Sequence, residues 1–90
     1  MAGFCGFRPI DGGPEIELVY GMRGEHWGNG LATEACASAL QYLWRSTDYQ
    51  RVYARADPPN FRSIRVMLRL NMTHESTTAS MITYVLRRAS

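Results

Sequence analysis

The sequence predicts a mixed α/β fold, in which a sheet of parallel and antiparallel strands carries two crossover helices. Two segments have the apolar period of an amphipathic helix, and five shorter segments have the alternation or the β-branched and aromatic content of strands. Their order along the chain is strand, strand, helix, strand, helix, strand, strand. A hairpin followed by helical crossovers requires both kinds of strand pairing, which implies a mixed sheet.

Size and composition favour a single soluble domain over residues 1–90. The chain is 46% hydrophobic and 20% charged, which is typical of a globular protein with a packed core. No apolar run reaches the roughly 18 residues that a membrane span needs, and residues 1–8 do not resemble a signal peptide. We therefore expect a cytoplasmic protein without a membrane partner.

The charge pattern gives no argument for a nucleic-acid partner. The net charge is only +2, although all ten lysine-or-arginine positions hold arginine, a residue that suits phosphate groups. Cys5 and Cys36 lack the spacing of a zinc or redox motif, so we expect reduced core thiols. His26 and His74 are far apart in the sequence and lack ligand spacing, so no metal site is expected.

The first two strands are expected over residues 3–8 and 15–22. Between them lies a dense turn signal, Asp11-Gly12-Gly13-Pro14, which predicts a hairpin. The second segment begins with alternating glutamate and aliphatic residues, so one of its faces should be buried.

The clearest element is a helix over residues 31–46, which directly follows a glycine-rich segment at residues 23–30. Its apolar side chains fall on one stripe, and the remaining surface is polar. The stripe consists of Leu31, Ala35, Cys36, Ala39, Leu40 and Leu43.

The next strand is expected over residues 51–56, where Pro58 and Pro59 then stop it because proline cannot donate to a sheet ladder. Asn60 is suited to cap a helix over residues 61–70, and Asn71 tolerates the left-handed geometry that ends a helix.

In this second helix the pattern predicts an apolar and a basic face. Ile64, Met67 and Leu68 are expected to point inward, whereas the outward side carries Arg62, Arg65 and Arg69. Strands over residues 72–76 and 81–88 then close the chain.

The glycine-rich segment has the features of a phosphate-binding loop. It joins a strand to the start of a helix, where unpaired backbone N–H groups and the positive helix end point at one place. We assign Gly28 and Gly30 to the close approach of a pyrophosphate.

Nucleotide-triphosphate, dinucleotide and coenzyme A loops all share this construction. The first needs a Gly-Lys-Ser/Thr sequence, but Leu31 follows Gly30 and the chain has no lysine, which excludes it. The second needs a third glycine where this chain has Thr33, so it fits poorly.

Two blocks of sequence support the third option. WGNGLATEA at residues 27–35 closely resembles the coenzyme A loop of the GNAT-family N-acetyltransferases, in the version found in the ribosomal-protein (RimJ/RimL-like) branch. DPPNFRSIRV at residues 57–66, with LNM at residues 70–72, is similar to the segment after that family's fifth strand, and the spacing of the two blocks also agrees.

The resemblance covers nearly the whole chain. Nothing in it corresponds to the strand, two helices and strand with which such proteins usually begin and which form much of the acceptor cleft. The resemblance therefore implies the C-terminal, cofactor-binding part of a GNAT-type domain, with a mixed sheet that lacks the usual N-terminal strand and helices.

The family resemblance implies acetyl-CoA as cosubstrate and a primary amine, on a protein N-terminus or a small molecule, as acceptor. The pantetheine arm would lie in a gap between the strands at residues 15–22 and 51–56 and bond to their backbone. A backbone N–H near residues 20–22 would polarise the acetyl carbonyl, and the amine would attack directly. The implied cofactor-binding residues are Tyr20, Met22, Arg23, Trp27, Gly28, Asn29, Gly30, Leu31, Ala32, Asn60 and Ser63.

Two side chains are candidates for catalysis. Glu17 is the candidate base, but a solvent-facing carboxylate is an equal alternative, and Glu15 has the same parity. Ser63 matches a serine of the ribosomal-protein branch and could bond the leaving sulfur, although Ser63 and Asn60 are also ordinary helix caps. Met67 stands where many relatives place a proton-donating tyrosine.

Each of several other residues near the loop has two possible roles. Trp27 could cover the cofactor or pack against the helix, and Arg23 could reach a phosphate or lie in solvent. The arginines of the second helix could contact the adenosine 3′-phosphate or form a solvated face. Glu25 replaces the family's usual glutamine or arginine, and its carboxylate would repel phosphate if it pointed inward.

Three functions are therefore open. The first is an acetyl-CoA-dependent N-acetyltransferase. The second is a coenzyme A-binding module without catalysis, which the missing front elements and the absent tyrosine favour. The third is a dimerisation module, because sheet edges left exposed could pair two copies into a homodimer.

Overall fold

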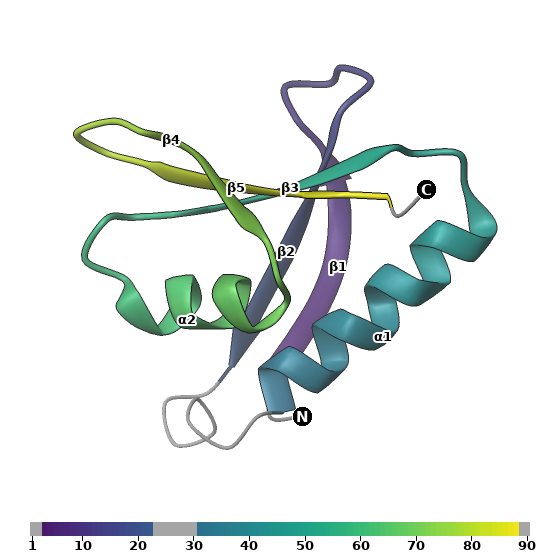
Figure 1. Cartoon of the computed structure of the whole chain (residues 1–90), viewed down its shortest axis with the longest axis horizontal. Helices are drawn as coiled ribbons and strands as arrows, with labels where there is room; N and C mark the ends of the chain where they lie inside the picture. Colours follow the sequence, from purple (N-terminus) through teal and green to yellow (C-terminus); the bar gives the residue numbers. More distant parts are fainter. Residues whose placement is uncertain (1–2, 23–30, 89–90) are drawn as a thin grey trace.

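The computed structural model describes residues 3–22 and 31–88, and within them the elements follow the expected order (Figure 1). The strands are β1 (Gly3–Pro9), β2 (Ile16–Met22), β3 (Arg51–Ala56), β4 (Thr73–Thr77) and β5 (Ile82–Arg87). The helices are α1 (Leu31–Ser46) and α2 (Phe61–Arg69). The mixed α/β prediction is confirmed.

The strands form one sheet in the order β1-β2-β3-β5-β4. β1 and β2 are the predicted antiparallel hairpin, and β5 lies antiparallel between β3 and β4. β2 and β3 are parallel neighbours, and α1 is the crossover that joins them. The sheet is therefore mixed because a helical crossover separates two antiparallel units.

The parallel pair is joined at one point among the described residues. β1 and β2 match over seven positions and β3 and β5 over six, whereas β2 and β3 share only the register Glu17↔Tyr53. Beyond that point the facing edges of β2 and β3 are not bonded to each other. The two parallel strands therefore diverge beyond this position.

Local signals in the sequence explain the connections. Asp11 and Gly12 both have positive φ, the conformation that tight hairpin turns require, and Gly13 N–H donates to the Ile10 carbonyl at 2.8 Å. Asn60 Oδ1 accepts from Ser63 N–H at 3.2 Å, so Asn60 caps α2 as expected. Asn71 has φ 64° and ends α2 in the left-handed region, which confirms that prediction.

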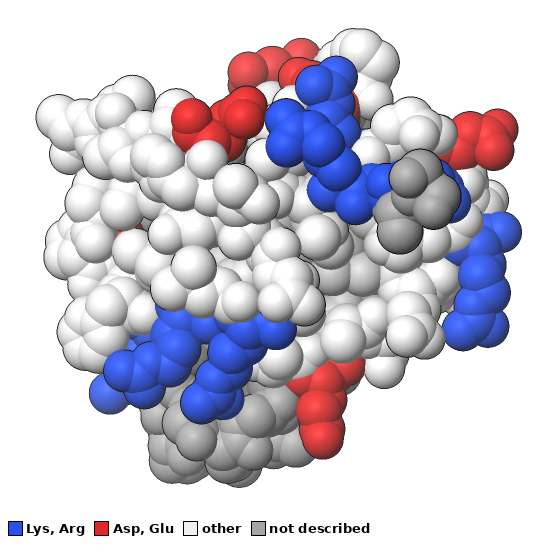
Figure 2. Space-filling model, viewed as in Figure 1, with Lys and Arg blue, Asp and Glu red and all other residues white. Residues whose placement is uncertain are grey.

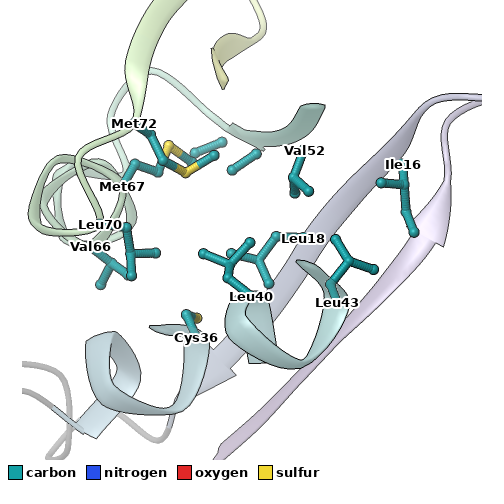
Figure 3. Packing of buried hydrophobic residues seen from close by; sticks show 12 residues of the cluster. Ile16, Leu18, Cys36, Leu40, Leu43, Val52, Val66, Met67, Leu70 and Met72 are labelled. Carbon is teal, nitrogen blue, oxygen red and sulfur yellow. The ribbon is translucent and has the colours of Figure 1, made fainter. Parts of the chain in front are cut away.

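The core lies between one face of the sheet and both helices (Figure 3). Ile16 and Leu18 of β2 face the same cluster as Val52 of β3, following the alternation of a strand. Side chains of α1 and α2 point into it from the other side. The helical members are Cys36, Leu40, Leu43, Val66 and Met67, with Leu70 and Met72 just after α2.

Two side chains differ from the predicted core. Leu68 is 55% exposed, because the buried face of α2 is centred on Ser63, Val66 and Met67. Those positions have the spacing of a single helical face, and Leu68 lies to its side. Ala35 of α1 is also exposed, since the stripe that packs on the sheet runs through Cys36, one position further on.

Candidate functional site

A cavity of about 470 Å³ opens where β2 and β3 diverge. Its walls include Glu17 and Leu18, successive residues of β2 whose side chains point to opposite faces of the sheet. α2 closes one side with Asn60 and Ser63, and β1 contributes Arg8. The cavity therefore lies beside β2, β3 and the start of α2, and its volume lies in the usual range of ligand sites.

Glu17 is a buried carboxylate held by two arginines. Its side chain is 3% exposed, and it accepts 2.7 and 2.8 Å bonds from the Arg55 guanidinium and a 2.8 Å bond from Arg8 Nε. The Arg55 hydrogen bond, with Arg8 adding to it, outweighs burial and lowers the pKa of Glu17. Glu17 is thus ionised at neutral pH and is not the solvent-facing carboxylate of the alternative reading.

Glu15 has the parity of Glu17 but a different environment. It is exposed, accepts a 2.9 Å hydrogen bond from the Tyr53 hydroxyl and lies 3.8 Å from Arg51. It is not among the residues that line the cavity. Of the two carboxylates, the geometry therefore brings only Glu17 to the gap.

Tyr20 of β2 and Ser63 of α2 meet across the cavity wall. The Tyr20 hydroxyl donates to the Ser63 carbonyl oxygen at 3.0 Å and lies 2.7 Å from Ser63 Oγ. Burial raises the pKa of Tyr20 to about 12, so this phenol stays protonated at neutral pH. Ser63 N–H donates to Asn60, which brings Tyr20, Ser63 and Asn60 into one hydrogen-bonded group.

The remaining predicted cofactor residues are only partly described. Met22 ends β2, and Leu31 and Ala32 begin α1, so the backbone at these positions borders the glycine-rich segment. The other five lie outside the described residues: Arg23, Trp27, Gly28, Asn29 and Gly30.

The arginines of α2 form an exposed basic group. Arg62, Arg65 and Arg69 are all exposed, as the sequence predicted, and Figure 2 shows basic side chains gathered over α2. Met67, which the family resemblance sets at the tyrosine position, is fully buried and carries no group that could exchange a proton.

Arg8 and Arg55 were not predicted as site residues, although the sequence held a signal for them. Glu17, Tyr53 and Arg55 lie on parallel neighbouring strands with the same parity, which places their side chains on one sheet face. This pattern can be recognised only when the register between β2 and β3 is known. Because α1 separates the two strands in the sequence, the spacing within either strand does not give that register.

Within residues 3–22 and 31–88 there is no group of three His, Cys, Asp or Glu side chains arranged to hold a metal ion. Neither described helix has the length and apolar character needed to cross a membrane.

Comparison with known proteins settles the family. The family model described as "Acetyltransferase (GNAT) domain" matches residues 1–73. The chain belongs to the GNAT acetyltransferase family. The match includes β1, β2, α1, β3 and α2, and therefore every element that lines the cavity between β2 and β3 except the segment around Met81.

Curated relatives of this GNAT chain are longer proteins. It is 35% identical over 77 residues to the uncharacterized protein YkkB of Bacillus subtilis, covering 83% of the chain and 45% of YkkB. It is 34% identical to the uncharacterized N-acetyltransferase p20 of Bacillus licheniformis, covering 83% of the chain and 43% of p20. The chain thus spans less than half the length of these relatives.

Solved structures share the fold of the GNAT chain. An acetyltransferase of the GNAT family from Bacillus anthracis superposes with a TM-score of 0.83 at 22% identity, covering 97% of this chain and 58% of that one. YncA from Salmonella typhimurium, a putative acetyltransferase solved with its cofactor acetyl-CoA, gives 0.78 at 19% identity, covering 96% and 57%.

Proposed function

We propose that this chain binds acetyl-CoA in the gap between β2 and β3 and forms the cofactor-binding part of an N-acetyltransferase. The observation that carries the proposal is the single register Glu17↔Tyr53, beyond which the two parallel strands leave a cavity of about 470 Å³. An extended pantetheine arm can bond to the backbone of a strand as an added strand would. The solved YncA, which shares this fold, holds acetyl-CoA.

The acetyl group then lies at the end of β2, beside the hydroxyl groups of Tyr20 and Ser63. A backbone N–H near residues 20–22 polarises the carbonyl, and the pyrophosphate rests on the amides of residues 27–32. These placements follow the family resemblance, and the loop part of them concerns residues outside the described ones.

The acceptor is a primary amine of a protein N-terminus or of a small molecule. Glu17 remains the candidate base, in its ionised form, because it lines the cavity and Glu15 does not. Its two arginine partners lower its pKa and weaken it as a base, so we expect its contribution to the rate to be small. The RimJ/RimL-like branch is supported by Asn60 and Ser63 at the start of α2.

Calorimetric titration of acetyl-CoA into the purified chain tests the cofactor site. We expect micromolar binding in the wild type and its loss in Val19→Trp, which fills the cavity that Val19 lines, and in Gly28→Trp, which blocks the loop. Tyr42→Trp is the matched control, because Tyr42 is 72% exposed on α1 and should leave binding unchanged. Absence of binding by a folded wild-type protein would overturn the proposal.

A coenzyme A-binding module without catalysis is the second candidate. Two observations favour it, namely the pairing of Glu17 with two arginines and the apolar Met67 at the tyrosine position. Release of free coenzyme A thiol from acetyl-CoA, measured with and without a panel of amines, separates the two. Amine-dependent release supports the enzyme, whereas tight binding without release supports the module.

Homodimer formation through a sheet edge is a further expectation. β4 is an unsuitable edge, because all five of its residues are exposed and its register is irregular between His74 and Ser76. β1, with a mixed sequence and regular pairing, is the edge we propose for contact between two copies. Light scattering after size-exclusion chromatography measures the assembly, and a monomer at all concentrations would exclude it.

A further inference from the structure

The contact between Tyr20 and Ser63 joins two hydroxyl groups that come from different elements. Tyr20 Oη lies 2.7 Å from Ser63 Oγ and 3.0 Å from the carbonyl oxygen of Ser63. Both residues line the cavity, and Ser63 is buried at 6% exposure. A tyrosine on β2 thus reaches the first turn of α2, although the family's tyrosine position on that helix holds Met67.

Two hydrogen-bond arrangements are compatible with the same heavy-atom positions. In the first, Tyr20 donates to the Ser63 carbonyl oxygen, and Ser63 Oγ–H donates to Tyr20 Oη. In the second, the Tyr20 O–H turns toward Ser63 Oγ, and the Ser63 O–H is released to point elsewhere. The two arrangements differ only in the positions of the two hydroxyl hydrogens. Both are possible because each hydroxyl group can donate and accept a hydrogen bond.

The second arrangement gives Ser63 a proton to offer inside the cavity. A hydroxyl whose oxygen already accepts a hydrogen bond is a stronger donor to a third group, since neighbouring hydrogen bonds polarise one another. The phenol can fill this role throughout the neutral range, because burial keeps it protonated.

We propose that Tyr20 is a positioning residue that directs the Ser63 hydroxyl toward the sulfur of coenzyme A, so that the pair stabilises the leaving thiolate. The inference rests on the proposed acetyl-CoA site. In the transfer step the amine nitrogen bonds to the acetyl carbon, and the carbon–sulfur bond breaks. Sulfur keeps the bonding electron pair as a thiolate, the proton lost by the amine goes to water, and Ser63 donates a hydrogen bond without giving up its proton.

The binding of free coenzyme A tests this role without requiring turnover. Coenzyme A and acetyl-CoA are titrated separately into the wild type at about pH 7 and about pH 9.5, values on either side of the usual thiol pKa. Acetyl-CoA has no ionisable thiol. The affinity for coenzyme A divided by the affinity for acetyl-CoA therefore reports how ionisation of the thiol changes binding. Hydrogen bonds to a charged group are worth about 1.5–3 kcal/mol, so we expect the ratio to rise about tenfold or more with pH.

Tyr20→Phe and Ser63→Ala are each expected to remove most of that rise in the ratio of the two affinities, whatever each substitution does to the affinity for acetyl-CoA itself. The double variant should show no further loss, because the two hydroxyl groups act as one unit. Tyr42→Phe is the control, since it removes a hydroxyl from an exposed tyrosine on α1. A role of Tyr20 in stability alone would lower the unfolding temperature without changing the pH dependence of the ratio.

Each other outcome overturns the inference. A Tyr20→Phe protein that keeps the wild-type rise shows that Tyr20 does not act through Ser63, and an unchanged rise in both variants excludes the pair. Should Tyr20→Phe not fold, the ¹³Cζ resonance of Tyr20 in the wild type must shift on binding coenzyme A at about pH 9.5 and not on binding acetyl-CoA. If the folded wild type binds acetyl-CoA but the ratio does not rise with pH, only the inference is contradicted. If it binds neither compound, both the proposed function and the inference are contradicted.

Discussion

At the scale of single residues, the surroundings of Glu17 determine how well its carboxylate can act as a base. A carboxylate that is 3% exposed would be costly without partners, and Arg55 and Arg8 supply them. The two arginines differ in exposure, 29% for Arg55 and 63% for Arg8, so water screens the Arg8 contact more strongly. The bidentate Arg55 contact therefore contributes most of the stabilisation.

Replacing Glu17 with glutamine should lower the free energy of unfolding at neutral pH by about 1–3 kcal/mol, because both guanidinium groups lose their anion. The lowered pKa sets the direction of the pH dependence. Stabilisation by Glu17 is complete above its unfolded pKa of about 4.3 and is lost as pH falls through the lower folded value. Urea unfolding at about pH 7 and about pH 3 should show a smaller acid loss in Glu17→Gln than in wild type.

Glu15→Gln is the matched control for this measurement. Glu15 is exposed, and a glutamine oxygen can still accept from Tyr53, so a change within about 0.5 kcal/mol is expected at either pH. Equal losses in the two variants would contradict the buried ion pair.

The two cysteines lie in contact, with their sulfur atoms 3.6 Å apart, and their thiols ionise in a fixed order. The hydrogen bond between the two thiols lowers the pKa of Cys5, and the same contact together with burial raises the pKa of Cys36. Cys5 is also the more accessible, since Cys36 is fully buried. The first thiolate therefore forms on Cys5.

Iodoacetamide should accordingly alkylate Cys5 before Cys36 in the folded protein. Peptide mass spectrometry over time gives the order, and the same reaction in urea should remove the difference, because unfolding abolishes the contact. Faster modification of Cys36 in the folded protein would contradict the assignment.

At the scale of elements, Arg88 connects the end of the chain to the end of α1. Its guanidinium donates to the carbonyl oxygens of Trp44, Thr47 and Tyr49 at 2.7–2.9 Å and lies 4.9 Å from the Trp44 ring. The last carbonyls of a helix lack partners within the helix. A cation near them also interacts favourably with the negative end of the helix dipole. One side chain thus holds α1 and β5 in place relative to each other.

Arg88→Met keeps the apolar stem and removes the donors. We expect a loss of about 1.5–3 kcal/mol in unfolding free energy, because three carbonyl groups lose a charged partner. Arg87→Met is the neighbouring control, since Arg87 is exposed and its guanidinium lies 3.9 Å from the Glu75 carboxylate, a long ion-pair distance. Its expected cost is within about 0.5 kcal/mol, and denaturant titration of both variants compares them.

Element bounds followed from the sequence because their signals are local. The hairpin turn at residues 11–14, the cap Asn60 and the terminator Asn71 each act within a few residues, and the structure confirms all three features. Leu68 was wrongly placed inward, since apolar character alone does not say which face of a short helix meets the sheet. The position of α2 in three dimensions decided that.

The candidate site was less accessible to prediction, because its contacts cross between elements. Glu17 and Ser63 were selected from the sequence, but Arg55 reaches Glu17 only through the β2–β3 register. Tyr20 was expected to act through its backbone, and the hydroxyl contact with Ser63 depends on how α2 packs against β2. Such distances are products of the whole fold.

At the scale of the whole molecule, one apolar cluster connects both helices with β2 and β3. Met67 is among its largest fully buried side chains and lies between α2 and the sheet (Figure 3). A chain of this size has little stability to spare, and a single core that spans most elements leaves few parts able to unfold alone. Loss of packing at Met67 should therefore be felt throughout the protein.

Met67→Ala should lower the unfolding free energy by about 2–5 kcal/mol, because a large buried side chain leaves a cavity. Leu68→Ala is its control on the same helix. With Leu68 55% exposed, its cost should be about 1 kcal/mol or less. Tryptophan fluorescence and far-ultraviolet circular dichroism should report coincident transitions in each variant, as two-state unfolding requires. Separate transitions in Met67→Ala, or equal costs of the two substitutions, would mean that α2 does not share one core with α1.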